Sequence, residues 1–345
     1  MKLVVSKPFY YAINVLIALL FLTTTVSAQR TTSSTGNWSA TGTWTAANTN
    51  RTGTVTSATN STTVTGSGTS FTTELSVGSM IGTQGATAIG TVASITSNTS
   101  LTLTGNASNA VSAQSYRTTG GVPSPNDAVT ITSTHNVTVN GTFTCASLNI
   151  GDGGNSTAQI TFSGTNPQLT VTGNINVGQT SGGNNRTGRI TFTSDATLTA
   201  GTLVLFQNTT SSIVCSIIMT SGGTLKTGSF SLGTGSTAPT WTPGTGTVEL
   251  TATNTLPAST FTSFNNLNIT GGTTSLGAAL SIDTLNISNG VTITPGSNLV
   301  TLSGDLVNNG TVTSGSGGLT ISGTATQLVG VFLLDVRKQT LDNRR

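Results

Sequence analysis

Short runs that alternate apolar residues with Thr, Ser or Asn fill the chain from Ala128 onward. A period of two places the branched apolar side chains on one face of a strand and the hydroxyls on the other. Gly, Asn and Ser, which form turns, separate the runs. No helical period is sustained after the first 28 residues, so the pattern predicts an all-β protein. The runs are Val129-Thr-Ile131, Val137-Thr-Val139, Ile160-Thr-Phe162, Leu169-Thr-Val171, Ile175-Asn-Val177, Ile190-Thr-Phe192, Val248-Glu-Leu250, Leu267-Asn-Ile269, Leu280-Ser-Ile282, Leu285-Asn-Ile287, Val291-Thr-Ile293 and Leu319-Thr-Ile321.

Sandwich, barrel and solenoid folds can all be built from such strands, and internal repetition favours the solenoid. The tripeptide Leu-Asn-Ile recurs at Leu148, Leu267 and Leu285. Very short strands with small residues at the corners suit a coil with one strand on each face. Coils stacked about 4.8 Å apart pair the backbone of each interior coil with its neighbours. We therefore predict a right-handed parallel β-helix over residues 119–330.

Residues 48–118 interrupt this pattern of short alternating runs, and they predict a separate domain. Strand-like runs such as Thr62-Thr-Val-Thr and Ser100-Leu-Thr-Leu103 suggest about five strands, the size of a small antiparallel β-barrel. The order of these runs resembles small β-domains of phage tail and bacterial surface proteins. Ser79 stands where those domains usually carry Asp.

The residues on either side of this insertion carry a second resemblance. Trp38 and Trp44 precede it, and Pro123 and Asp127 follow it. Joined together, these segments resemble the start of the eight-glycine domain, a β-helical module of secreted and surface proteins. The two Trp residues are expected to cover the first coil, with 29–47 as an N-terminal cap, because an unpaired edge recruits other strands. Asp127 is expected to accept backbone N–H bonds in the turn after Pro123.

The body from Gly244 to Gly310 resembles repeats of large Bacteroidetes-type surface proteins. Near Gly330 the repeats give way to an atypical tail, 331–345, of abruptly different composition. Two interpretations of this tail stand: a capping helix, or the product of a truncated or frame-shifted reading frame.

Residues 1–28 have the features of a secretory signal peptide. Lys2 and Lys7 precede an apolar run from Ala12 to Leu22, which is too short to span a bilayer about 30 Å thick. Small residues ending at Ala28 predict cleavage before Gln29. The mature chain is therefore expected to be secreted, or to lie on the outer cell surface.

Composition restricts the chemistry open to the chain. Charged residues make up 6 % of it, with a single His and two Cys. The net charge of +3 comes from the two ends, so no basic patch for nucleic acid is expected between them. Cys145 and Cys215 lie in apolar runs and are expected to be unpaired core thiols, although a disulfide between them stays open. One His and two Cys at these spacings do not suit a zinc site.

No catalytic, metal or cofactor residues are predicted. A glycosidase needs two carboxyl groups within about 5–10 Å of each other, and no spacing in this chain demonstrates such a pair. The single acid in the loop 151–155 fits a turn better than a calcium site. The acids of the body stand singly, at Glu74, Asp127, Asp152, Asp195, Glu249, Asp283 and Asp305.

The sequence therefore predicts an exported, non-catalytic structural or adhesive module of the bacterial surface, with surface glycans or surface proteins as partners. A polysaccharide-binding or polysaccharide-degrading β-helix is one alternative. An ice-binding solenoid is another, because Thr-x-Thr pairs such as Thr197/Thr199 and Thr292/Thr294 resemble those of some ice-binding solenoids, although the uneven repeat spacing argues against one flat rank. Thr is also simply a good residue for exposed strands.

Overall fold

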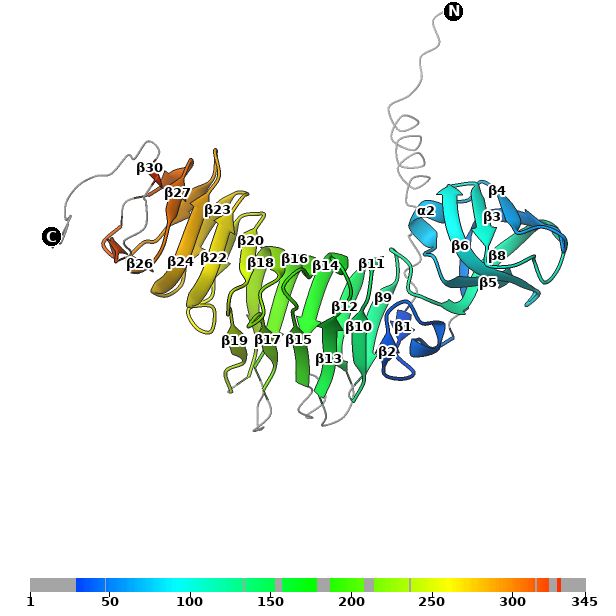
Figure 1. The fold of residues 1–345 in the computed structure, drawn as a ribbon, viewed down its shortest axis with the longest axis horizontal. Helices are drawn as coiled ribbons and strands as arrows, with labels where there is room; N and C mark the ends of the chain where they lie inside the picture. Colours follow the sequence, from blue (N-terminus) through cyan, green and yellow to red (C-terminus); the bar gives the residue numbers. More distant parts are fainter. Residues whose placement is uncertain are drawn as a thin grey trace, which may run out of the picture.

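The computed structural model describes residues 29–46, 48–132, 134–152, 157–178, 187–207, 214–235, 237–313, 315–322 and 328–329. The predicted signal peptide, 1–28, and the atypical tail, 331–345, lie outside these residues. The described chain forms a parallel β-helix with a closed antiparallel barrel beside its first coils (Figure 1). The predicted all-β fold is confirmed.

The largest sheet runs the length of the β-helix, and all of its strand pairs are parallel. Its strands are β1 (Gln29–Thr31), β9 (Ala128–Thr132), β11 (Thr142–Cys145), β12 (Ser147–Asp152), β14 (Gln168–Val177), β16 (Thr197–Phe206), β18 (Thr224–Gly233), β20 (Thr247–Leu250), β22 (Ser263–Ile269), β24 (Leu280–Ile287), β26 (Val300–Leu302), β27 (Leu306–Asn308), β29 (Leu319–Ile321) and β30 (Leu328–Val329).

Two shorter parallel sheets share the rest of the solenoid wall. The first belongs to the N-terminal coils and contains β2 (Gly36–Asn37), β10 (Asn136–Val139), β13 (Thr157–Phe162), β15 (Thr187–Thr191), β17 (Ser216–Ile218) and β19 (Thr240–Thr242). The second belongs to the C-terminal coils and contains β21 (Asn254–Leu256), β23 (Thr273–Leu276), β25 (Thr292–Thr294) and β28 (Thr311–Val312).

The alternation in the sequence produces columns of apolar side chains along the solenoid interior. The strand register aligns Leu169 with Leu198, Leu225, Val248, Leu267, Leu285 and Leu306 in successive coils. Each of these side chains is at most 2 % exposed. The Thr, Ser and Asn residues between them face outward, as the period of two predicts.

The coils shorten toward the C-terminus. A side-chain hydrogen bond joins Asn149 and Asn176 across neighbouring coils, 27 residues apart. Near the other end, the bond between Asp283 and Ser303 spans 20 residues.

Several strands are longer than the predicted runs because two runs join around a corner. In β14, β16 and β18 the corner is Gly173, Gly201 and Gly228, stacked directly on one another. A Cβ on Gly228 would lie 2.5 Å from the carbonyl oxygen of Gly201. Glycine is needed at this corner because neighbouring backbones approach too closely for any side chain.

The inserted domain is a barrel that closes in the order β3-β4-β7-β6-β5-β8. Six strands build it, against the five predicted. β8 closes the barrel by pairing with both β3 and β5, which carries the domain to Gly121, beyond the predicted end at residue 118. The elements are β3 (Thr49–Ser57), β4 (Thr63–Ser67), a short helix α2 (Phe71–Glu74), β5 (Ser79–Thr83), β6 (Ala88–Ser97), β7 (Ser100–Leu103) and β8 (Val111–Gly121).

The predicted N-terminal cap, 29–47, contributes strands of its own: β1 pairs with β9, and β2 pairs with β10. A 3₁₀ turn, η1 (Thr41–Thr43), precedes Trp44. Trp38 and Trp44 are buried in the solenoid core, with ring centroids 5.0 Å apart. Trp38 also stacks on Phe143 of the following coil, so the two indoles fill this end of the interior.

Candidate functional site

Five carboxylates in the described part of the chain bind hydroxyls, N–H groups or cations: Glu74, Asp127, Asp195, Glu249 and Asp283. Glu249 lies 3.0 Å from Lys226 on the neighbouring strand, and Asp195 accepts a hydrogen bond from the Asn166 backbone. The described part of the chain includes no cluster of three metal-ligating side chains.

The most concentrated group of charges lies where the barrel meets the solenoid. Asp127 lies in the turn before β9, and Arg51 belongs to β3. Nη2 of Arg51 lies 3.1 Å from Oδ1 of Asp127. Arg30 of β1 lies on the other side, with Nε 3.9 Å from Oδ2. All three side chains are 3 % exposed or less. We call Arg30, Arg51 and Asp127 the junction cluster.

Each member of the junction cluster is held by backbone or hydroxyl groups. Oδ2 of Asp127 accepts the Ser124 N–H at 2.9 Å, which confirms the predicted turn. Arg51 donates to Thr118 Oγ1 at 3.2 Å, on the last barrel strand. Arg30 donates to the carbonyl oxygen of Gly121. The cluster therefore ties together β1, β3, the end of β8 and the turn before β9.

Arg30 occupies an inward-facing position, paired in register with Val129. The charged side chain of Arg30 therefore lies at the end of the column of apolar interior residues that contains Val129. Burial, with a smaller contribution from Arg51, lowers the pKa of Arg30, and the charge of Asp127 opposes this shift. A buried charge is tolerated when paired, which makes Asp127 the residue on which the junction depends.

Sequence reasoning identified Asp127 but missed both arginines. The one signal that could have found them was an isolated Arg inside a strand-like run of a chain with few charges. Their meeting at Asp127 depends on the insertion point of the barrel, because Arg51 and Asp127 are 76 residues apart.

His135 is a second residue whose contacts the sequence did not reveal. Its Nδ1 lies 2.8 Å from Thr32 Oγ1 and 2.9 Å from Thr132 Oγ1. These hydroxyls are also 3.0 Å apart. The group fastens the first coil to the second, which is a structural role.

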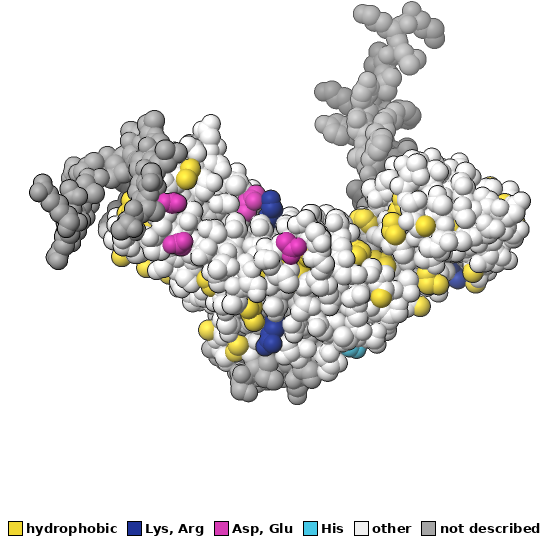
Figure 2. Space-filling model, viewed as in Figure 1, with side chains coloured by type: hydrophobic (Ala, Val, Ile, Leu, Met, Phe, Trp, Pro, Cys, Tyr) yellow, Lys and Arg dark blue, Asp and Glu magenta, His cyan; other side chains and the backbone are white. Residues whose placement is uncertain are grey.

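The outer face of the large sheet carries aligned polar columns. In one of them Thr197, Thr224 and Thr247 follow in register, and Asn266 continues the column. In the neighbouring column Thr199 is followed by Lys226 and Glu249. Figure 2 shows a mostly uncharged surface with a few separate charged side chains. Because Lys226 and Glu249 follow Thr199 in the second column, the Thr-x-Thr pair of Thr197 and Thr199 is not repeated on the next two strands.

The barrel has its own polar anchor, centred on Glu74 of α2. The carboxylate accepts bonds from the Thr52 N–H at 3.1 Å and from the Tyr116 hydroxyl at 3.0 Å. Burial, then the charge and hydrogen bond of Glu74, raises the pKa of Tyr116. Ser79 Oγ accepts the Ser76 N–H at 3.0 Å. These contacts all serve the barrel structure.

Cys145 and Cys215 are both buried, and no disulfide joins them, as expected. Burial raises the pKa of each thiol, and the charge of Asp127 adds to the shift at Cys145. Residues 153–155 of the loop 151–155 lie outside the described residues.

No protein-family model matches the chain, and searches of curated proteins and of solved structures give no match. Among the helices of the described residues, none is both long and apolar enough to cross a bilayer.

Proposed function

We propose that this chain is an exported, non-catalytic module of the bacterial surface, in which the β-helix is a scaffold and the barrel is an adhesive head. The observation that carries the proposal is the junction cluster. Buried ionic contacts from three separate segments fix the barrel on the scaffold, a rigid attachment that suits the display of a binding domain.

The barrel also exposes apolar side chains that its own core does not use. Val77, just before β5, is 57 % exposed, and Met80 on β5 is 42 % exposed. Exposed apolar groups on a polar surface favour contact with a partner when they lie together. We assign the adhesive contact to this segment, with surface glycans or surface proteins as the partner class.

The polysaccharide-degrading alternative has less support, because Asp127 and Glu249 are already paired with cations and Asp195 accepts a backbone N–H. The ice-binding alternative is disfavoured by Lys226 and Glu249, which interrupt the Thr column beside Thr199. An extended polysaccharide laid along the polar columns is the second candidate for the scaffold face.

Binding of the purified mature chain to a glycan array and to intact bacterial cells tests the adhesive role. The double variant Val77→Asp/Met80→Asp should lose at least about tenfold in affinity. Thr255→Asp, an exposed position on β21 of the solenoid, is the matched control and should bind as the parent does. Release of sugar products from a polysaccharide would instead establish an enzyme, and thermal hysteresis would establish ice binding.

Export is tested separately by expressing the complete sequence in a Gram-negative host. The proposal expects a product outside the cytoplasm whose N-terminus is Gln29. A cytoplasmic product that retains Met1 would contradict it.

A further inference from the structure

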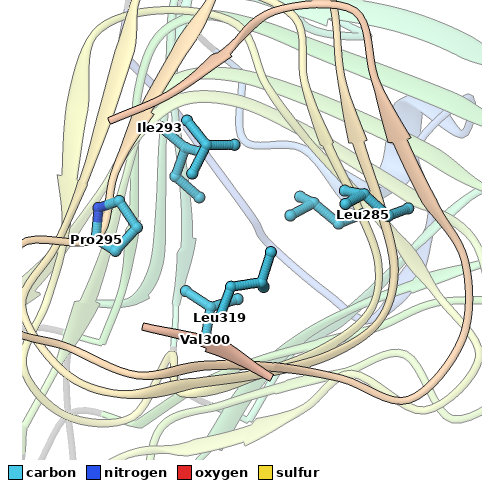
Figure 3. Close-up of a pocket in the computed structure, with 7 residues that line it drawn as sticks. Leu285, Ile293, Pro295, Val300 and Leu319 are labelled. Carbon is cyan, nitrogen blue, oxygen red and sulfur yellow. The ribbon is translucent and has the colours of Figure 1, made fainter. Parts of the chain in front are cut away.

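The interior of the C-terminal coils and the outer face of the barrel offer different chemistry to a ligand. Inside the coils lies an apolar pocket, with Leu285 and Ile293 on its walls (Figure 3). A site that selects its ligand also needs polar groups at fixed positions, and the side chains around this pocket supply none. All of them are aliphatic: Leu285, Ile293, Pro295, Val300, Leu306, Val312 and Leu319.

The outer face of the barrel, in contrast, carries an arginine with no acid beside it. Of the two arginines in the barrel, Arg51 contacts Asp127. The single acid of the barrel, Glu74, accepts the Tyr116 hydroxyl. The half-buried guanidinium of Arg117 has no hydrogen-bond or ion-pair partner among the described residues. Its Nε is buried, so Nη1 and Nη2 are the nitrogens open to a ligand.

The strand register places Arg117 and Met80 on the same face of the barrel. Arg117 of β8 lies opposite Gly82 of β5, and Met80 of β5 lies opposite Gly120 of β8. Opposite residues of an antiparallel pair point to the same side of the sheet. Ile81, between Met80 and Gly82, is buried in the barrel core, so its two neighbours on β5 face outward.

Small polar side chains complete this face. Asn50 of β3 is exposed and lies opposite Arg117 on the other side of β8. Thr91 of β6 is half-buried and lies opposite Met80 on the other side of β5. Thr119 is the extra residue where the register of β8 shifts against β5. We call these residues, with the exposed Val77, the barrel face: Asn50, Val77, Met80, Thr91, Arg117 and Thr119.

We propose that the barrel face binds a glycan that contains uronic acid, with the guanidinium of Arg117 holding a sugar carboxylate; this inference rests on the adhesive role proposed above. An arginine binds a carboxylate through two parallel N–H groups, which gives both charge pairing and orientation. Val77 and Met80 offer apolar contact to the C–H groups of a sugar ring. The Asn50 amide and the Thr91 hydroxyl can bond to its hydroxyls.

The size of the barrel face favours a glycan over a protein partner. Among the described residues of the barrel, Val77 and Met80 are the only large apolar side chains that are exposed. A stable protein interface buries about 800 Å² on each partner around an apolar centre. Two exposed apolar side chains and one unpaired charge suit a few sugar rings instead.

Binding of acidic oligosaccharides to the purified chain tests the proposal. Oligomers of alginate, polygalacturonate and hyaluronate are compared with the same oligomers after reduction of their carboxyl groups to alcohols. At least one acidic oligomer should bind at least about tenfold more tightly than its reduced counterpart. This preference should weaken as salt is raised, because a charge at the surface is screened. Equal binding of acidic and reduced oligomers, or no binding of any acidic one, would overturn the proposal.

A pair of charge-matched variants locates the site. Arg117→Gln should lose the preference for acidic oligomers, whereas Arg189→Gln should keep it. Each substitution removes one positive charge, but Arg189 lies on β15 of the solenoid, where its Nε donates to Ser216. Equal losses in the two variants would assign the effect to net charge and contradict the site. The comparison of acidic with reduced oligomers on the parent chain needs no substitution, so it stands even where Arg117→Gln fails to fold.

The outcomes also separate this inference from the adhesive role. Binding to neutral glycans or to a surface protein, lost in Val77→Asp/Met80→Asp, would overturn the acidic ligand and leave the adhesive role in place. Absence of binding to every glycan and to intact cells would overturn both.

Discussion

At the residue scale, the contact between barrel and solenoid depends on Asp127. Its carboxylate contacts two buried guanidinium groups and also accepts the Ser124 N–H. Removing one partner of a buried ionic group leaves uncompensated charge, which costs far more than the loss of an exposed pair. The junction therefore depends on a single negative charge.

We predict that Asp127→Asn lowers the free energy of unfolding by about 3–5 kcal/mol, because Arg30 and Arg51 stay buried without a counter-charge. Urea denaturation measures the change. Asp195→Asn, at an exposed turn, is the control and should have little effect. A loss below about 1 kcal/mol in Asp127→Asn would mean that solvent reaches the junction.

The two thiols give a second prediction at this scale. Burial raises the pKa of Cys145 and Cys215, so both remain protonated at neutral and mildly alkaline pH. Because the thiolate is the reacting species, alkylation of the native protein at pH 8 should be at least about tenfold slower than in denaturant. An introduced surface thiol, Thr255→Cys, should react quickly in the native protein, and rapid native labelling of Cys145 would contradict its buried position.

At the element scale, the stacked glycines fix the corner of the long strands. A Cβ at residue 228 would lie 2.5 Å from the Gly201 carbonyl oxygen and 3.5 Å from Ala252 Cβ. The neighbouring carbonyl belongs to the same hydrogen-bonded stack, so it has little freedom to move away.

We therefore expect Gly228→Ala to cost about 1–3 kcal/mol of stability, measured by thermal or urea unfolding. Gly105→Ala is the matched control, because nothing lies within 4 Å of its Cβ position. That control should be neutral or slightly stabilising. Equal effects of the two substitutions would show that the corner is not tightly packed.

At the scale of the whole molecule, the barrel and the solenoid have separate hydrophobic cores. Leu101 belongs to the barrel core and Leu203 to the solenoid core, and both are completely buried. The two units touch through the polar junction cluster, so each core is expected to report on its own unit.

Leu101→Ala should remove about 2–5 kcal/mol of hydrogen-exchange protection from β4 and β7 while β16 keeps its protection. Leu203→Ala should have the reverse pattern. Loss of protection throughout the chain in both variants would show that barrel and solenoid unfold as one cooperative unit.

The sequence by itself determined the fold class and most of the strand positions. Alternation such as Val129-Thr-Ile131 is a local property, and in a solenoid each inward residue meets its counterpart on the next coil, so local patterning specifies the core. The different pattern of strand-like runs in 48–118 likewise indicated an inserted domain. The burial of the two thiols and the turn at Asp127 followed from their immediate neighbours.

Tertiary structure alone decided the features that join distant segments. Arg30 and Arg51 meet at Asp127 because the barrel leaves and re-enters the solenoid at adjacent points, which no local pattern encodes. The corner glycines acquire their role from the backbone of another coil, and His135 acquires its partners from the first.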